Sequence, residues 1–448
     1  MFRFPAALTG GQQNICSAAD SRGGIALHIS QSSFPVTLRA DQKLQSNPWL
    51  VVGLLWVAGC LNYLDRLMIT TMRGSIKVAI PMTEAQFGLL TSVVLVVYGI
   101  CSPFAGYFAD RLNRSSVIIG SVFAWSVVTG LTAYARTYEQ LLALRALLAV
   151  SQVACVPATV ALVVEYHRGS SRSLASGILL SGAMAGGAFS GLGGWLAAGP
   201  GWTYAHKLFG LVGIGYSIIL LFMLRDPPDS EGMPAKGDAP APTVRLGEAF
   251  RVLFSNRSYL LILAYNCVLG VVAWSVVGWM PTYMKERFNL SQGEAGISTT
   301  VYLNTAALIG LIIGGKWADR WSRTNKRARL IVPMIGLCVA APAVLLLANA
   351  SLLTLALAGL VIYGLGRYFA DANMMPILCL LVDPRYRATS WGVASLFSTI
   401  VGGVGIYAGG LLRDSHIDIS RVFQFAAINL LVSALLLFFI CRRQTRPA

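Results

Sequence analysis

Charged residues are scarce in this chain. Only 12% of its 448 residues are Asp, Glu, Lys or Arg, whereas 55% are hydrophobic. An ordinary soluble domain carries about 25% charged residues, so water is excluded as the main solvent around this chain. Apolar runs of about 20 residues follow one another after Trp49, and in lipid such runs must be helical because every backbone N–H and C=O group needs an internal partner.

Residues that carry enzyme chemistry or bind metals are also sparse. The four histidines are scattered, and the eight cysteines have no CxxC spacing and lie nearly all within apolar runs. We therefore expect no metal site, and we interpret the cysteines as small buried apolar residues. Paired carboxylates, a Ser/His/Asp set and a nucleotide-binding Walker loop are missing as well. The sequence thus predicts neither an enzyme nor a cofactor.

The apolar runs predict an all-α membrane protein with about twelve transmembrane helices. Residues 226–257 are rich in Pro, Gly and charge, and this linker divides the spans into six and six. The first 47 residues are polar and lack the features of a signal peptide, so we expect a disordered cytoplasmic tail. The predicted domains are a tail (1–47), a six-helix bundle (48–225), the linker (226–257), a second six-helix bundle (258–441) and a short cytoplasmic tail (442–448).

We expect the twelve spans near residues 49–72, 86–108, 115–135, 140–164, 173–198, 204–224, 259–281, 296–316, 330–349, 352–381, 389–412 and 422–441. The end of the linker places apolar residues at helical spacing beside Arg245, Arg251 and Arg257. This pattern predicts a helix that lies on the inner membrane surface. An extension of the seventh span explains the pattern equally well.

The net charge of +16 follows from the distribution of the 35 Lys and Arg residues. If the N-terminus is cytoplasmic, 24 of them lie in the tails and cytoplasmic loops, 8 lie in or beside the external loops, and 3 lie within spans. This is the positive-inside pattern of membrane proteins, and it explains the basic balance without a nucleic-acid partner. We expect both termini in the cytoplasm.

One motif, G-x-x-A-D-R-x-x-R, occurs twice, at residues 106–114 and 315–323, each time behind a long apolar stretch. Arg and Gly five apart open both the fifth and the eleventh spans, and Pro157 and Pro376 break the spans before them. The halves therefore correspond helix by helix, which predicts two pseudo-symmetric bundles that move against each other. For the charged motif, the alternative is a loop that only sets topology. The predicted gating residues are Gly106, Asp110, Arg111, Arg114, Gly315, Asp319, Arg320 and Arg323.

These paired loops resemble the signature of the major facilitator superfamily over residues 49–441. Within it, the segment from Asn62 to Arg66, Arg145 in the fourth span, and the segment from Trp279 to Tyr283 resemble the organic anion:cation symporter branch, and the Spinster-like branch shares much of this pattern. The resemblance implies a proton-driven carrier of small organic anions with a site between the bundles. Members commonly have a Glu seven residues after the Arg of the fourth span, where this chain has Gln152.

Charged residues inside the first and fourth spans are candidates for the site. A charge at the centre of a spanning helix costs about 2.5 to 3.5 kcal/mol, so Asp65, Arg66 and Arg145 should face water or partners. We predict Asp65 as a proton carrier, Arg66 as part of the anion site, and Arg145 as a partner of Asp65 that protonation would free for substrate. The alternatives are a pair that snorkels to the outer surface and a static ion pair.

The tenth span carries a further charged pair. Arg367 and Asp371 are four residues apart, so they share one helix face, where they can line a cavity together with Asn373. Asp371 precedes Pro376 by five residues, just as Gln152 precedes Pro157. We therefore predict that Asp371 supplies the titratable carboxylate missing at Gln152, with a purely structural pair as the alternative.

Several neutral polar residues in the spans are further candidates for substrate contacts. The alternative for each is a hydrogen bond between helices or an aromatic side chain at the membrane interface. These candidates are Tyr63, Gln152, Asn266, Trp274, Tyr302 and Asn304.

The leading interpretation is a secondary carrier, in the bacterial inner membrane, that moves a sugar acid such as a hexuronate, aldonate or sialic acid inward with protons. Its expected partners are this anion, protons and membrane lipid, and we expect a monomer. Moving one charge through 100 mV supplies about 2.3 kcal/mol, which permits accumulation without nucleotide hydrolysis. The alternatives are a Spinster-like exporter of lipid or lysolipid and a membrane sensor that does not transport.

Overall fold

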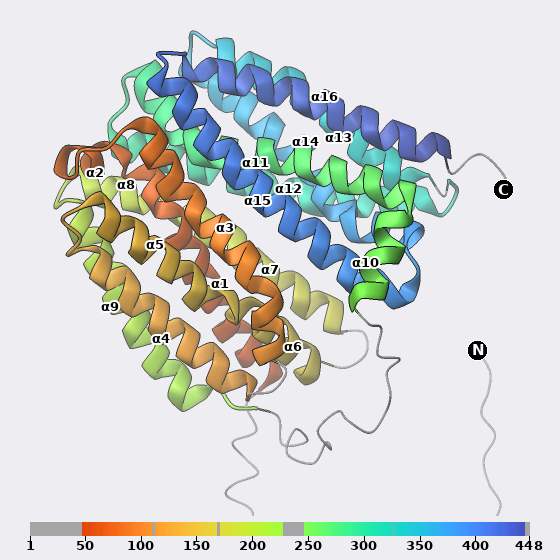
Figure 1. The fold of residues 1–448 in the computed structure, drawn as a ribbon, viewed down its shortest axis with the longest axis horizontal. Coiled ribbons are helices and arrows are strands. Elements are labelled where there is room, and N and C mark those ends of the chain that lie inside the picture. The colour runs from red at the N-terminus through yellow and green to blue at the C-terminus, as the bar shows by residue number, and fades with distance from the viewer. Residues whose placement is uncertain (1–46, 110–112, 168–170, 227–245, 326, 444–448) are drawn as a thin grey trace, which may run out of the picture. The chain divides into compact units, whose positions relative to one another are not determined.

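The computed structural model describes residues 47–109, 113–167, 171–226, 246–325 and 327–443. The predicted N-terminal tail up to residue 46, most of the linker, Asp110, Arg111 and the last five residues lie outside this range. Twelve helices of the described range are long and apolar enough to cross a membrane, which confirms the predicted number. Figure 1 shows these helices as two groups, one formed before and one after the linker.

The spans of the first half are α1 (Pro48–Thr71), α3 (Glu84–Ala109), α4 (Arg114–Thr132), α5 with α6 (Tyr138–Val153 and Cys155–Tyr166), α7 with α8 (Ser171–Phe189 and Gly191–Ala198) and α9 (Trp202–Met223). Those of the second half are α11 (Arg257–Phe288), α12 (Gln292–Ser322), α13 (Ala328–Asn349), α14 (Leu353–Leu381), α15 (Arg387–Asp414) and α16 (Ile419–Arg443). Three short helices lie between spans: α2 (Arg73–Ala79), α10 (Leu246–Ser255) and the 3-10 helix η3 (Pro384–Tyr386).

Proline acts differently in the two corresponding spans. The fourth span is interrupted because α5 ends at Val153, the residue whose carbonyl would have received the missing N–H of Pro157. In contrast, α14 continues through Pro376, so the predicted break of the tenth span is wrong. Membrane helices tolerate an internal proline when neighbouring groups satisfy the backbone that it leaves free.

Glycines allow the helices of each half to pack closely. A Cβ at Gly186 of α7 would lie 2.1 Å from the carbonyl oxygen of Cys60, so only glycine permits this contact between α7 and α1. In the second half, a Cβ at Gly310 of α12 would lie 2.4 Å from the carbonyl oxygen of Leu365 on α14. Small residues give membrane helices this close approach, where lipid supplies no hydrophobic driving force.

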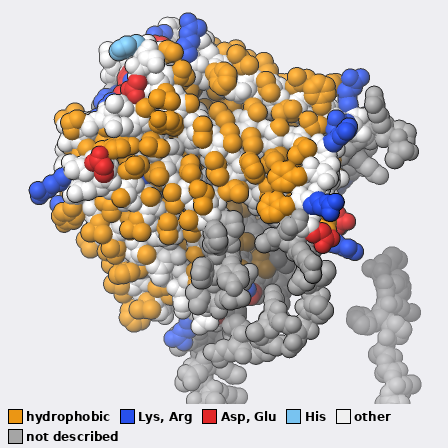
Figure 2. All heavy atoms as spheres, in the orientation of Figure 1, with side chains coloured by type: hydrophobic (Ala, Val, Ile, Leu, Met, Phe, Trp, Pro, Cys, Tyr) orange, Lys and Arg blue, Asp and Glu red, His pale blue; other side chains and the backbone are white. Residues whose placement is uncertain are grey.

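The two bundles meet along a limited set of helices. Helix α3 packs against α15, α7 and α8 pack against α12, and α1 packs against α11. We call the membrane face where α1 and α11 begin the terminal face, and the opposite face, where both of these helices end, the far face. Figure 2 shows hydrophobic side chains over the visible side of the bundles, with charged side chains mainly where helices end, as expected for a lipid-facing surface.

Candidate functional site

A central cavity lies between the bundles. It measures about 890 Å³, including its open mouth, and is lined by residues of α1, α7, α11, α12 and α14. Its wall mixes apolar with polar and aromatic side chains, as ligand sites do. The polar and aromatic residues that line it are Tyr63, Thr70, Ser190, Trp274, Thr299, Thr300, Asn304, Arg367, Tyr368 and Asp371.

Arg367 and Asp371 are the only charged side chains that the described residues contribute to this wall. They form an ion pair along α14, as their spacing predicts. The side chain of Arg367 is 9% exposed, whereas that of Asp371 is 39% exposed. The ring of Tyr368 lies 4.8 Å from the guanidinium carbon. The carboxylate is therefore open to cavity water, and an incoming anion would compete with it for Arg367.

Of the neutral candidates, Tyr63, Trp274 and Asn304 line the cavity. The side chain of Asn304 also lies against Gly187 of α7, where a Cβ would be 2.4 Å from its oxygen. The hydroxyl of Thr299, a residue that the sequence analysis missed, is buried without a hydrogen-bond partner among the described residues.

Three other candidates do not line the cavity. Asn266 donates a hydrogen bond to the carbonyl oxygen of Ile262 and contacts the sulfur of Met374. Asn373 donates to carbonyl oxygens of α14 and α12, at 2.9 Å and 3.4 Å. Tyr302 is 47% exposed and is absent from the cavity wall. Each asparagine thus contacts a neighbouring helix, Asn266 through the sulfur of Met374 and Asn373 through the carbonyl oxygen of Gly314.

A second polar cluster lies inside the N-terminal bundle. The guanidinium of Arg66 donates to the side-chain oxygen of Gln152 at 3.3 Å and 3.2 Å, and its carbon lies 4.4 Å from the ring centre of Tyr98. Gln152 in turn donates to the carbonyl oxygen of Asn62. Gln152 is fully buried and 6% of Arg66 is exposed, but Arg66 lines a small cavity beside the central one, whose empty volume of about 240 Å³ includes open solvent.

Arg145 approaches Asp65 through the main chain. Its guanidinium donates to the carbonyl oxygens of Asp65 at 3.3 Å and of Arg66 at 2.8 Å. The carboxylate of Asp65 faces Trp125 and Thr129 of α4, and one of its oxygens has no hydrogen-bond partner in the described range. Both Asp65 and Arg145 are 2% exposed, so both side chains are enclosed within the bundle.

We expect Arg145→Met to destabilise the protein itself. The change removes the buried donor of two main-chain carbonyl oxygens, each loss costing about 1 to 3 kcal/mol, and it takes away the positive charge near Asp65. The melting temperature of the purified protein without substrate should fall. Adding Asp65→Asn to the same variant should restore part of the lost melting temperature. An unchanged melting temperature in the single variant would contradict the predicted electrostatic contact between Arg145 and Asp65.

The structure describes part of each copy of the repeated motif. Arg114 pairs with Glu165 at the end of α6, within the N-terminal bundle. Asp319 pairs with Arg329 at 3.4 Å, within the C-terminal bundle, and its side chain is 72% exposed. Gly315, Arg320 and Arg323 lie at the same end of α12, and a Cβ at Gly315 would lie 3.9 Å from the Cβ of Ala372 on α14. Gly106 lies in α3, and its surroundings lie outside the described range.

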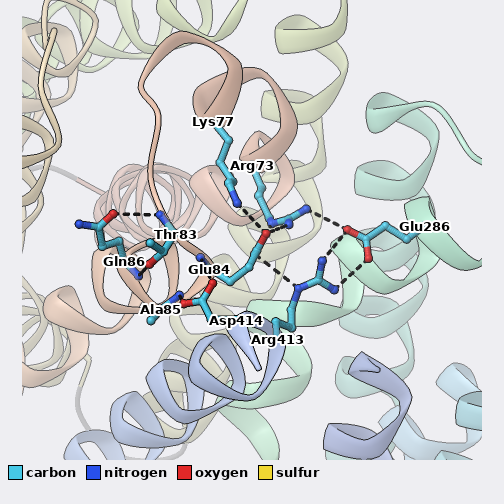
Figure 3. A network of polar contacts seen from close by, with 9 residues as sticks. All are labelled: Arg73, Lys77, Thr83, Glu84, Ala85, Gln86, Glu286, Arg413 and Asp414. Atoms are coloured by element: carbon cyan, nitrogen blue, oxygen red, sulfur yellow. Dashed lines mark hydrogen bonds and ion pairs between the residues drawn. The ribbon is translucent and has the colours of Figure 1, made fainter. Parts of the chain in front are cut away.

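The far face carries an ion network that the sequence analysis missed. Figure 3 shows Arg73 and Lys77 of α2 and Arg413 of α15 around the carboxylate of Glu84 at the start of α3. Glu286 at the end of α11 accepts from Arg73 at 3.0 Å and from Arg413 at 2.8 Å and 2.9 Å. Two of these pairs, Arg73 with Glu286 and Arg413 with Glu84, join the two bundles.

The same network caps a helix across the bundle interface. The two carboxylate oxygens of Asp414 accept from the backbone N–H groups of Glu84 and Ala85, each at 2.8 Å. Thr83 and Gln86 of the N-terminal bundle satisfy each other's N–H groups in a capping box. A residue of one bundle thus completes the cap of a helix in the other, which stabilises the closed far face.

Every hydrogen bond and ion pair recorded between the bundles, within the described range, lies near the cavity or between it and the far face. Besides the network, the hydroxyl of Thr300 donates to the carbonyl oxygen of Ala188, and Ser75 of α2 bonds to Gln292 of α12. A Cβ at Gly191 would lie 2.8 Å from the Cα of Ile297. These contacts close the far face.

Two bundles of six membrane spans around one polar chamber are the architecture of a membrane transport protein. The sequence model of the Major Facilitator Superfamily matches residues 55–406 and 288–448, and the chain belongs to this superfamily. Among the described residues, no group of three His, Cys, Asp or Glu side chains is placed to hold a metal ion.

The chain is similar to proteins with different named roles. An MFS-type efflux pump of Mycolicibacterium smegmatis is 26% identical over 387 residues, which cover 85% of this chain and 88% of that protein. A probable sulfoacetate transporter of Cupriavidus necator is 24% identical over 406 residues, with 87% and 93% covered. A solved bacterial homolog of the human lysosomal transporter Spinster, in an inward-facing and unoccupied conformation, shares the fold, with 23% identity, a TM-score of 0.75, and 90% and 98% covered.

Proposed function

We propose that the protein carries a small organic anion, of the sugar-acid class, across the membrane together with protons. The observation that supports this most is the Arg367–Asp371 pair in the wall of the central cavity, with the carboxylate exposed to the cavity. An anion needs a positive partner in such a chamber, and Arg367 is the one cation that the described wall supplies. The similarity to a probable sulfoacetate transporter supports an anionic substrate.

The proposed coupling uses competition for one guanidinium. While Asp371 is ionised it occupies Arg367, so an anionic substrate must displace it. Protonation of Asp371 removes that competitor and frees Arg367 to bind the substrate carboxylate. Proton and anion therefore favour each other's binding, as linkage requires. When both leave on the other side, the pair re-forms and neutralises the empty site.

The remaining candidate residues fall into groups with different proposed roles, according to the contacts that each side chain makes. Tyr63, Asn304 and Arg66 are proposed to contact substrate because they line the central cavity or the small cavity beside it. Asp65 remains a proposed proton site. Arg145, Gln152, Asn266 and Asn373 are proposed as supports, because main-chain carbonyls or neighbouring side chains already occupy their donors.

We place the terminal face in the cytoplasm of a bacterial cell, since the Lys and Arg excess marks that side. The closed far face would then be external, so the described state would load or release substrate on the cytoplasmic side. The repeated motif is proposed to hold the cytoplasmic face closed in the opposite state. Its residue Asp319 has no described contact across the bundles, as that proposal requires for the present state. We infer that a monomer suffices, because the chamber is built within one chain.

Export of an amphipathic solute is the second candidate. Leu67, Met184, Val277 and Leu303 give part of the cavity wall an apolar surface, and the M. smegmatis relative is an efflux pump. Binding of lysolipid to the purified protein would test this possibility directly. A protein that binds a sugar acid but never moves it in proteoliposomes would instead be a receptor.

A thermal-shift screen of sugar acids and lysolipids at two pH values tests the proposal. Saturation at about 100 times the dissociation constant adds about 2.7 kcal/mol of stability. Because anion binding takes up a proton, the shift for a sugar acid should be larger near pH 6 than near pH 8. A shift that is independent of pH, or larger at the higher pH, would contradict proton symport, and a response to lysolipid alone would favour export.

A further inference from the structure

Three cavities follow one another between the bundles, and Thr70 of α1 lines all of them. Beyond the central cavity and the small one beside Arg66 lies a small cavity, which we call the outer cavity; its empty volume of about 230 Å³ includes solvent at its open mouth. Its wall includes Arg73 and Gly74 of α2, Thr282 and Lys285 of α11, and Gln292 of α12. It therefore lies across the bundle interface, on the far-face side of the chamber.

The outer cavity contains a hydroxyl that lacks a partner. Thr282 is 4% exposed, and its side-chain oxygen makes no hydrogen bond within the described range. Threonines in membrane helices commonly bond to a carbonyl one turn earlier, as Thr300 does with Gly296. A buried polar group that stays unsatisfied calls for an explanation, and an ion or water in the adjoining cavity is one.

The outer cavity also holds a cation without a counter-ion. Lys285 forms no ion pair with any described residue, while Glu84 and Glu286 on the same face are already shared by other cations. A Cβ at Gly74 would lie 2.7 Å from the ammonium nitrogen of Lys285 and 2.6 Å from the side-chain oxygen of Gln292. The ammonium group of the lysine thus lies close to α2, beside Gly74.

We propose that Lys285 and Thr282 form an outer anion site, which takes a chloride ion or a carboxylate group. The ammonium and the hydroxyl supply donors to one anion, whereas Arg73 at the rim is already paired with Glu84 and Glu286. If the anion is the carboxylate of the transported solute, an idea that rests on the proposed function, the outer site is the first stop on its path from the far face. Thr70 then connects it to the chamber that contains Arg367.

Protection of Lys285 from acylation tests the site directly. The full-length protein in lipid nanodiscs is treated with a sulfonated succinimidyl ester in potassium chloride, potassium gluconate or potassium HEPES at equal ionic strength, and mass spectrometry follows each lysine. We expect chloride or gluconate to slow the labelling of Lys285 by about fivefold or more relative to HEPES. Lys207, whose ammonium lies 5.0 Å from the ring of Tyr134, is the control and should be unaffected.

The anion that protects identifies the occupant. Protection by gluconate alone assigns the site to the solute path, and protection by chloride as well assigns it to small anions in general. Thr282→Val should reduce the protection, whereas Thr282→Ser, which keeps the hydroxyl, should retain it. Equal labelling in all three salts would overturn the proposal. Because the readout is not transport, protection that persists in Asp371→Asn would uphold the outer site even if proton coupling failed.

Discussion

Asp371→Asn should abolish accumulation of the anion against its gradient and leave exchange of anion for anion close to normal. The amide is nearly isosteric and keeps a weak contact with Arg367, but it cannot bind and release a proton. Substrate then has permanent access to the guanidinium, and proton movement is no longer tied to anion movement. Without that link, the roughly 2.3 kcal/mol that each charge gains per 100 mV is lost to transport.

Two assays in proteoliposomes separate these effects. Uptake driven by an imposed proton gradient should fall at least about tenfold, and counterflow without a gradient should change by no more than about twofold. Asp418→Asn is the matched control. Its carboxylate lies on the far face, where it caps Ser420, and the hydrogen bonds of Ser420 hold the pKa of Asp418 below its usual value. Uphill uptake that survives Asp371→Asn would rule out Asp371 as the coupling group.

The sequence was most informative where one pattern repeats over many residues. Span length and hydropathy predicted all twelve transmembrane helices, because lipid allows few other structures for long apolar runs. The four-residue spacing of Arg367 and Asp371 placed both on one helix face, and the structure places that face in the cavity wall. Residue spacing within one helix sufficed for this prediction.

The sequence was less informative where the rotation of a helix against its neighbours decides the contact. Asn373 lies only two residues after Asp371, yet it faces Gly314 of α12 instead of the chamber. Arg145 reaches the segment of Asp65 as expected, but its donors bind main-chain oxygens, whose positions depend on how α1 packs. Such choices follow from tertiary packing, which hydropathy and spacing do not determine.

The far-face network could not be recognised from sequence for a related reason. Its members extend from Arg73 to Asp414, and each resembles an ordinary loop charge when considered alone. Only the approach of α3 to α15 brings Glu84 beside Arg413. The side chains of Arg73, Glu84 and Arg413 are only 13% to 15% exposed, so their pairs are less screened than typical surface pairs.

Glu84→Gln should therefore shift the protein toward a state with an open far face. The change removes the carboxylate that Arg73, Lys77 and Arg413 share, and the remaining positive charges on α2 and α15 repel each other. A loss of about 1.4 kcal/mol at this contact would raise the open population about tenfold.

The reporter for this shift is Ser75→Cys in a background that lacks the eight native cysteines. Ser75 is half-buried at the closed interface, where it bonds to Gln292, so a membrane-impermeant maleimide reaches it from the far side when the bundles separate. The labelling rate should rise about tenfold with Glu84→Gln and return toward the parent value with Glu84→Asp. Glu294→Gln is the matched control, because Glu294 serves only the capping box of α12, a role that Gln can also fill. If the labelling rate with Glu84→Gln equalled the rate with Glu294→Gln, the network would be a passive surface cluster. Closure of the far face would then depend on the glycine contacts between α8 and α12 instead.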